Sequence, residues 1–190
     1  DFVDPMCGSG TLIIEAALMA RNIYPGVFRK EFAFEKWSDF DRELFDRIYN
    51  DDNDEREFTH KIYGYDINQP AIDVAQANVK SAGVADCVTV ERRPVQQFEQ
   101  PSEPTLMVTN PPYGERITSP DLLGLYRSLG ERLKHQFVGN TAWVICNRAE
   151  LFDQIGLKPS VRIPLFNGAL DCELRKYQIF DGKYDDFRAD

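Results

Sequence analysis

Short apolar segments alternate with amphipathic segments along this chain, and this alternation limits its possible folds more than any other feature. The amphipathic segments place apolar residues at helical spacing, and the apolar segments between them are extended in character. Such alternation is typical of a parallel sheet with helices on both faces. We therefore predict an α/β fold with a doubly wound, mostly parallel, seven-stranded sheet that ends in an antiparallel hairpin. The predicted strands are 1–4, 61–66, 88–91, 105–109, 141–146, 161–166 and 172–180.

Turn residues mark the ends of the predicted elements. A first helix from Thr11 to Asn22 stops at Pro25-Gly26, and a helix that begins at Asn68 or Gln69 is closed by Gly83. Another helix is expected over about 120–137. Asn167-Gly168, between the last two strands, is a strong hairpin signal.

Residues 23–60 interrupt the alternation and are predicted to be an insertion after the first helix. Aromatic residues are frequent in 27–40 without a clean period, so we expect an ordered segment packed on the body of the domain. Ser38 or Asp39 is expected to cap a second helix that runs to about Arg56. The buried face of that helix is expected to consist of Leu44, Phe45 and Ile48.

Composition excludes several classes of protein. The 190 residues are 43% hydrophobic, which is enough to form the core of one domain and excludes a wholly disordered chain. The 22 Lys+Arg against 31 Asp+Glu give a net charge of −9, which argues against a self-sufficient nucleic-acid binder. No apolar run approaches the roughly 18 residues that span a membrane, so no membrane association is expected.

The cysteines argue against a metal site. Cys7, Cys87, Cys146 and Cys172 are scattered without a C-x-x-C spacing, and the chain has only two histidines. We therefore expect no metal, and reduced thiols in a cytoplasmic protein. A thiolate of Cys7 or Cys146 that adds to a pyrimidine ring is a chemical alternative, but neither residue has an activating neighbour in the sequence.

The first predicted strand runs directly into residues 4–11 (Asp-Pro-Met-Cys-Gly-Ser-Gly-Thr). Gly8 and Gly10 leave room for a ligand to approach the backbone, and helix N–H groups lie just beyond them. A glycine pair also suits a tight strand-to-helix turn that binds nothing. The loop alone therefore leaves both interpretations open.

Asp66 ends the next predicted strand. In doubly wound sheets, ligands bind at the carboxyl ends of strands, and a carboxylate there accepts hydrogen bonds from ribose hydroxyls of nucleotide cofactors. Taken alone, Asp66 is better explained as an acid that caps the following helix. Together with the glycine loop, it becomes a candidate cofactor residue.

Residues 110–113 (Asn-Pro-Pro-Tyr) follow a third apolar strand. Two prolines make the backbone rigid and direct the Asn110 amide and the Pro111 carbonyl outward. These two acceptors, with the aromatic ring of Tyr113, suit a planar exocyclic amine on a base. In this strand-end context, we favour that interpretation over a turn without function.

Together these segments resemble the class I S-adenosylmethionine-dependent methyltransferases, whose fold is Rossmann-like. Residues 4–11 with 110–116 (Asn-Pro-Pro-Tyr-Gly-Glu-Arg) are closer still to the 23S ribosomal RNA guanine-N2 methyltransferases, in which an RNA-binding THUMP domain precedes the catalytic domain. The resemblance covers essentially the whole chain. It implies that 1–190 is a catalytic domain that methylates the N2 amine of a guanine in large-subunit ribosomal RNA.

The resemblance also implies roles for individual residues. Asp66 would hold the ribose of S-adenosylmethionine, and Ile67 would lie beside the cofactor. Asn110, Pro111 and Tyr113 would hold the target base. Asp4, Gly8 and Gly10 would line the methionine part of the cofactor. The other residues of this loop expected to bind the cofactor are Cys7, Ser9 and Thr11.

One segment departs from the superfamily pattern, in which an acid after the third strand often binds the cofactor's adenine amine. Residues 91–95 are Glu-Arg-Arg-Pro-Val, and Pro94 offers neither a carboxylate nor an N–H. We therefore expect the adenine to be held by other backbone groups or by apolar contact with Ile67 or Val95.

Two other functions are compatible with these segments. A DNA or RNA adenine-N6 methyltransferase would use the same Asn-Pro-Pro-Tyr segment, because its target is also a planar amine. This acidic chain, however, lacks a DNA-recognition region. A catalytically silent cofactor-binding module is the second alternative.

Because the chain begins at Asp1 inside a predicted strand, we expect a fragment whose RNA affinity comes mainly from a missing N-terminal domain. Arg116 would contact phosphate or pair with an acid.

Overall fold

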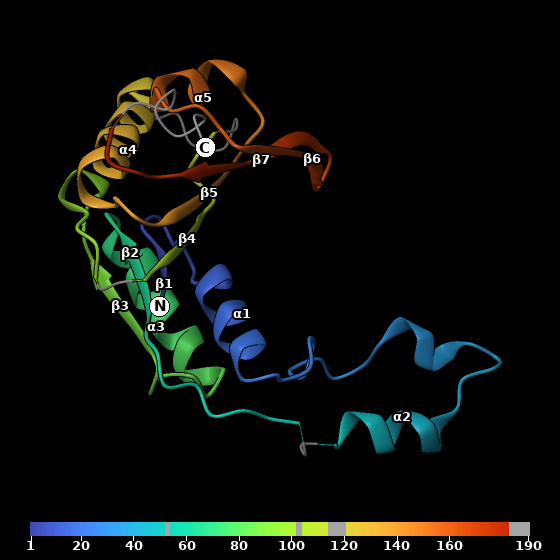
Figure 1. Ribbon diagram of the computed structural model, residues 1–190. Coiled ribbons are helices and arrows are strands. Elements are labelled where there is room, and N and C mark those ends of the chain that lie inside the picture. Colours follow the sequence, from blue (N-terminus) through green and yellow to red (C-terminus); the bar gives the residue numbers. More distant parts are fainter. Residues whose placement is uncertain (52–53, 102–103, 114–120, 183–190) are drawn as a thin grey trace.

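The computed structural model describes residues 1–51, 54–101, 104–113 and 121–182. Within these residues, seven strands form one sheet with the order β3-β2-β1-β4-β5-β7-β6 (Figure 1). The first five strands pair in parallel, and β7 runs antiparallel to both β5 and β6. The predicted doubly wound sheet with a C-terminal hairpin is confirmed. The strands are β1 Phe2–Asp4, β2 Ile62–Asp66, β3 Val88–Arg92, β4 Leu106–Thr109, β5 Thr141–Cys146, β6 Val161–Asn167 and β7 Leu170–Gln178.

The helices mostly begin at polar caps. The side chains of Asp41, Asn68 and Asp121 each accept a hydrogen bond from a backbone N–H three residues further on. The α1 helix instead follows Gly10, whose φ is +89°. As expected, α3 ends just before Gly83, which has a φ of +69°. The helices are α1 Thr11–Ala20, α2 Arg42–Tyr49, α3 Gln69–Ser81, α4 Leu122–Gln136 and α5 Ala149–Ile155, with 3-10 turns η1 Ala33–Lys36 and η2 Val95–Gln97.

The sheet separates two hydrophobic cores. One core joins α1 and α3 to β2 and β3, and the other joins α4, α5 and η2 to β1, β4 and β5. Successive residues of β2 point alternately into the two cores, with Ile62 in the first and Tyr65 in the second. Burial on both faces explains why the sequence reads as short, continuously apolar strands.

Gly64, in the middle of β2, allows α1 to approach the sheet closely. A Cβ atom at this position would lie 2.6 Å from Ile13 Cδ1 and 3.1 Å from Cys7 Sγ. Glycine inside a strand often marks such an approach of another element. Its missing side chain therefore helps to set where α1 and the glycine loop rest.

The insertion does not pack on the body of the domain as predicted. Residues 24–51, here called the aromatic arm, extend away from the sheet and carry α2 at a distance from it (Figure 1). Its rings pack on one another instead, with centroids 5.0 to 6.3 Å apart, and Leu44 and Ile48 remain 41% and 52% exposed. The aromatic side chains cover one another only in part and remain half-buried, without contact with the main core. The mutually packed rings are Phe32, Phe34, Phe40, Phe45 and Tyr49.

Two local boundaries also differ from the predictions. The helix of the aromatic arm is capped by Asp41, not by Ser38 or Asp39, and it ends at Tyr49. It does not reach Arg56, because the Arg56 N–H donates to the Arg21 carbonyl, 2.8 Å away, where the chain returns to α1.

In the hairpin, the turn is Gly168-Ala169, one residue later than predicted. Asn167 is the last residue of β6 and pairs with Leu170. None of the helices within the described ranges is long and apolar enough to cross a membrane.

We predict that Gly64→Ala lowers the free energy of unfolding by about 1–3 kcal/mol, because the new methyl group overlaps Ile13. Ile13→Val removes the overlapping Cδ1 atom and should cost only about 0.5–1.5 kcal/mol alone. Urea unfolding of both single variants and the double variant measures the coupling. The double variant should lose less stability than the sum of the two single losses. Strict additivity would show that Gly64 is not required for this contact.

Candidate active site

Three predicted site segments meet at one edge of the sheet. The parallel strands β1, β2 and β4 end at Asp4, Asp66 and Thr109, and β1 lies between the other two. The strand order reverses at β1 and β4, which is where open α/β sheets form their ligand crevice. The carboxyl edge around β1 is therefore the candidate active site.

The glycine loop is held by β2 and α3. The Cys7 N–H donates to the Tyr65 carbonyl at 2.8 Å, and the Gly8 N–H donates to Asp66 Oδ2 at 3.0 Å. From α3, Asn78 Nδ2 donates to the Ser9 carbonyl at 2.9 Å. The loop therefore has a defined path between the two strand ends.

The two glycines of this loop are needed for different reasons. Gly8 has a φ of +53°, and nothing lies within 4 Å of where its Cβ would be, so the space before it is open. Gly10 has a φ of +89°, and a Cβ there would lie 3.3 Å from that of Ala75. Gly8 thus leaves room on the crevice side, whereas Gly10 allows the loop to pack on α3.

Asp66 has a carboxylate oriented by the backbone on both sides. Its Oδ2 accepts from Gly8, and its Oδ1 accepts from the Asn68 N–H at 2.9 Å. A carboxylate has about four acceptor sites, so two further hydrogen bonds remain open to it. Ile67 follows with 62% of its surface exposed, whereas Val95 is buried in the core. Of these two predicted residues, Ile67 is therefore the one that presents an apolar side chain here.

Asp4 is an almost fully buried acid, with 1% of its surface exposed. Its Oδ1 accepts from Thr109 Oγ1 at 2.7 Å and from the Met6 N–H at 3.1 Å. Burial raises its pKa to about 7, although these hydrogen bonds act in the opposite direction. No Lys, Arg or His side chain of the described ranges forms an ion pair with it. A cationic group in the crevice would supply the missing counter-charge.

The segment after β4 has one exposed and one anchored side chain. Asn110 is exposed, and its side chain bonds to no residue in the described part of the chain. Tyr113 is only 7% exposed, and its hydroxyl accepts from Asn167 Nδ2 at 2.5 Å and lies 3.8 Å from Cys172 Sγ. Burial raises the pKa of this phenol. The ring is thus fastened to the β6–β7 hairpin, and its stacking on a base stays a prediction.

The remaining predicted residues are placed as follows. Ser9 and Thr11 are exposed at the start of α1, and Pro111 is buried. The Cys7 side chain lies in the core against Gly64. Arg116 lies outside the described residues.

The cysteines are poorly suited to nucleophilic catalysis. Burial, together with the nearby carboxylates of Asp4 and Asp66, raises the pKa of the Cys7 thiol to about 12. Burial also raises the pKa of Cys146. Because the thiolate is the reactive form, both residues are inert near neutral pH. Among the described residues, no three His, Cys, Asp or Glu side chains come together in a way that could hold a metal ion.

Sequence reasoning did not find four residues that shape this site: Gly64, Asn78, Thr109 and Asn167. Two of them carried a readable signal, since Gly64 is a glycine inside an apolar strand and Thr109 is a polar residue that ends one. Asn78 carried none and Asn167 only that of a hairpin turn, because the partners of these two residues in the site lie 69 and 54 positions away.

The chain is similar to known proteins over nearly its whole length. Residues 1–176 match the family described as "UPF0020: RMKL-like, methyltransferase domain". Two curated relatives, both named "Ribosomal RNA large subunit methyltransferase K/L", come from Aliivibrio salmonicida and Vibrio campbellii. The first is 40% identical over 185 residues and the second 37% over 195, covering 93% and 98% of this chain. The chain spans 26% and 28% of their lengths.

A solved structure, SMU.472 in complex with SAH (S-adenosylhomocysteine), has the same fold. It superposes with a TM-score of 0.81 at 30% identity, over 96% of this chain and 48% of that one.

We predict that Asp4 makes the unliganded protein less stable as the pH rises. Because the folded pKa of Asp4 is raised from 3.8 to about 7, the folded state binds the proton more tightly than the unfolded state. The stability that this provides is complete below about pH 4 and is lost as the pH rises through about 7. Asp4→Asn should flatten this part of the profile, while Asp73→Asn, an exposed control, should not. Urea unfolding at pH 5 and pH 8 is the measurement, and identical slopes for Asp4→Asn and wild type would contradict it.

Proposed function

Since the chain belongs to the UPF0020 family of RMKL-like methyltransferase domains, we propose that it transfers a methyl group from S-adenosylmethionine to the exocyclic N2 amine of a guanine in large-subunit ribosomal RNA. The observation that carries this proposal is the meeting of Asp4, Gly8 and Asp66 with the Asn110-Pro111 segment at one sheet edge. The names of the curated relatives support the substrate. The SAH complex of SMU.472 supports the cofactor.

The residues present fit S-adenosylmethionine. The open space before Gly8 admits a ligand close to the backbone. Buried Asp4 has no positive partner among the described residues, and a methionine ammonium or a sulfonium would provide one. The two acceptor sites left on Asp66 match a ribose diol, and Ile67 offers an apolar surface to adenine. The cofactor supplies an electrophilic methyl group on a sulfonium.

The protein's own contribution is to orient the acceptor amine. The lone pair of an exocyclic amine is delocalised into the ring, so the nitrogen is a poor nucleophile. The Asn110 side-chain oxygen and the Pro111 carbonyl accept its two hydrogens and favour a tetrahedral nitrogen as charge develops. Two consecutive prolines and the anchored Tyr113 keep these acceptors in one frame. Orientation of this kind contributes roughly 7–11 kcal/mol to lowering a bimolecular barrier.

We also propose that most RNA affinity comes from parts of the full-length protein outside this chain. A net charge of −9 opposes phosphate at long range, and the curated relatives carry about three quarters of their length outside the matched segment. Methylation of ribosomal RNA would place the protein in the cytoplasm.

Product mapping tests the proposed function. The full-length protein and residues 1–190 alone are each incubated with radiolabelled S-adenosylmethionine and unmodified large-subunit ribosomal RNA, and the labelled nucleoside is identified after digestion. We expect N2-methylguanosine, formed efficiently by the full-length protein and poorly by the chain alone. Labelled N6-methyladenosine would assign the chain to the adenine-N6 enzymes. Cofactor binding with no transfer would indicate a silent module.

We predict that Asp66→Ala weakens S-adenosylmethionine binding by about 1.5–3 kcal/mol, roughly tenfold to a hundredfold in Kd. The variant removes acceptors for the ribose and also the contact that positions Gly8. Calorimetric titration measures the effect, with Asp73→Ala on the exposed face of α3 as the matched control. An unchanged Kd in Asp66→Ala would remove this residue from the cofactor site.

We predict that Asn110→Ala lowers turnover about a hundredfold or more and leaves cofactor affinity nearly unchanged, because it removes one acceptor that acts in the transition state. Single-turnover methylation and calorimetry separate the two quantities, and Asn50→Ala on the aromatic arm is the control. A parallel loss of cofactor affinity would give Asn110 a structural or cofactor-binding role instead.

A further inference from the structure

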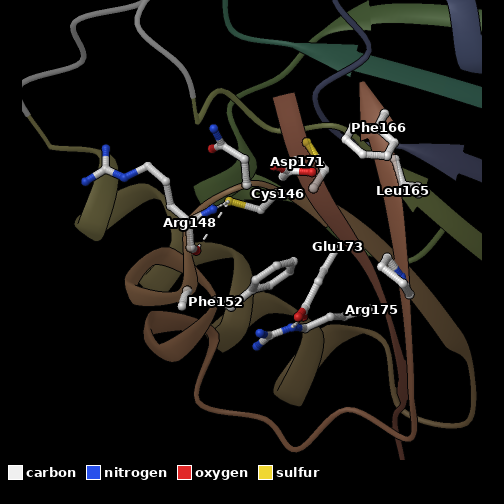
Figure 2. A pocket seen from close by; sticks show the side chains of 12 residues that line it. Cys146, Arg148, Phe152, Leu165, Phe166, Asp171, Glu173 and Arg175 are labelled. Atoms are coloured by element: carbon white, nitrogen blue, oxygen red, sulfur yellow. Dashed lines mark hydrogen bonds and ion pairs between the residues drawn. The ribbon is translucent and has the colours of Figure 1, made fainter. Parts of the chain in front are cut away.

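A cavity of about 500 Å³ lies beside the candidate active site, between the β5–α5 junction and the β6–β7 hairpin. Its volume is within the range of small-ligand sites. Figure 2 shows Leu165 and Phe166 on one side of it and Arg148 and Phe152 on the other. None of the roles assigned above uses it.

The hairpin presents a stacking group and an acceptor together. Phe166 pairs directly with Asp171 in the antiparallel register, and direct partners project from the same face of a sheet. Both residues line the cavity, and Phe166 is 75% exposed. An exposed phenylalanine beside a carboxylate provides a flat apolar surface next to a strong hydrogen-bond acceptor.

Two acceptors of the cavity have no donor within the described part of the chain. The Asp171 carboxylate forms no hydrogen bond or ion pair with any residue in the described ranges. Asn147 Oδ1 is buried and likewise has no hydrogen-bond partner there. A ligand with N–H groups on one edge would satisfy both.

The cations of the cavity are already paired. Arg148 bonds to Glu150 at 2.7 Å, and Arg175 bonds to Glu173 at 2.7 Å while its guanidinium lies 3.9 Å from the centre of the Phe152 ring. With both arginines paired to acids and Asp171 adding a negative charge, the cavity does not favour an anion such as phosphate. It suits a neutral, planar ligand.

The cavity is connected to the proposed methyl-acceptor position. Cys172 lines the cavity, and its Sγ lies 3.8 Å from the hydroxyl of Tyr113, which also receives the Asn167 side chain. The hairpin therefore forms a wall of the cavity and also anchors the Asn110–Tyr113 segment.

We propose that this cavity binds an unpaired nucleobase of the RNA substrate next to the methylated nucleotide. The base would stack on Phe166 and direct its amino or imino N–H groups to Asp171 and Asn147. Proteins that bind single-stranded RNA commonly combine an aromatic stacking surface with hydrogen bonds to base edges. The identity of the ligand as RNA rests on the proposed function, whereas the preference for a nucleobase rests on the cavity itself.

Nucleoside titration tests the cavity without methyl transfer. Amide signals of the isotopically labelled protein are followed by NMR while guanosine, cytidine, uridine or inorganic phosphate is added, with S-adenosylhomocysteine at saturation to occupy the cofactor site. Guanosine and cytidine should shift the amides of Asn147, Phe166 and Asp171 more than uridine does, because uracil has only one ring N–H. Phosphate should leave these signals in place. Shifts caused by phosphate but not by nucleosides would overturn the proposal in favour of an anion site.

Two variants with matched controls connect the cavity to RNA. Phe166→Ala and Asp171→Asn should each abolish the nucleoside shifts and raise the KM for ribosomal RNA of the full-length enzyme about fivefold to a hundredfold, with little change in kcat. Phe28→Ala on the aromatic arm and Asp153→Asn on α5 should match wild type. Both test positions are exposed, so the variants should fold.

The two proposals fail in distinguishable ways. Nucleoside shifts that depend on Phe166, in a protein that methylates no RNA, would retain the cavity and reject the proposed function. N2-methylguanosine formation with no nucleoside shifts and an unchanged KM in both variants would reject the cavity alone.

Discussion

The hydrogen bond from the Gly8 N–H to the Asp66 carboxylate organises the candidate site, because it joins two strand ends 58 positions apart. It orients the carboxylate and sets the path of the glycine loop, which the Cys7-to-Tyr65 backbone bond supports. On the other side of β1, Thr109 donates to buried Asp4 and connects β4 to the same edge. The crevice is therefore built from contacts between neighbouring parallel strands.

The β6–β7 hairpin extends this arrangement away from the cofactor side. Through Asn167 and Cys172 it holds Tyr113, and through the opposite partners Phe166 and Asp171 it forms a wall of the cavity. One antiparallel element thus contacts both the segment that would orient the target amine and the surface that would hold the adjacent base. Cys172 takes part in both, because it lines the cavity and contacts the Tyr113 hydroxyl.

Much of this fold could be predicted because its signals are local. Apolar periodicity, Gly83 after a helix and the proline pair after β4 act within a few residues. The aromatic arm could not be predicted in the same way, because its rings pack on each other without a regular period. The burial of Tyr113 could not be predicted from nearby residues either, because its partner Asn167 follows 54 positions later.

The amino-acid sequence by itself determined the order of strands and helices and which chemical groups stand at the strand ends. Only the tertiary structure decided the state of those groups: Asp4 with a raised pKa, Asp66 oriented by Gly8, Tyr113 turned inward and Phe166 left exposed. The physical reason is that propensity and turn geometry depend on neighbours in the chain. Desolvation and long-range hydrogen bonds depend instead on which strands lie side by side.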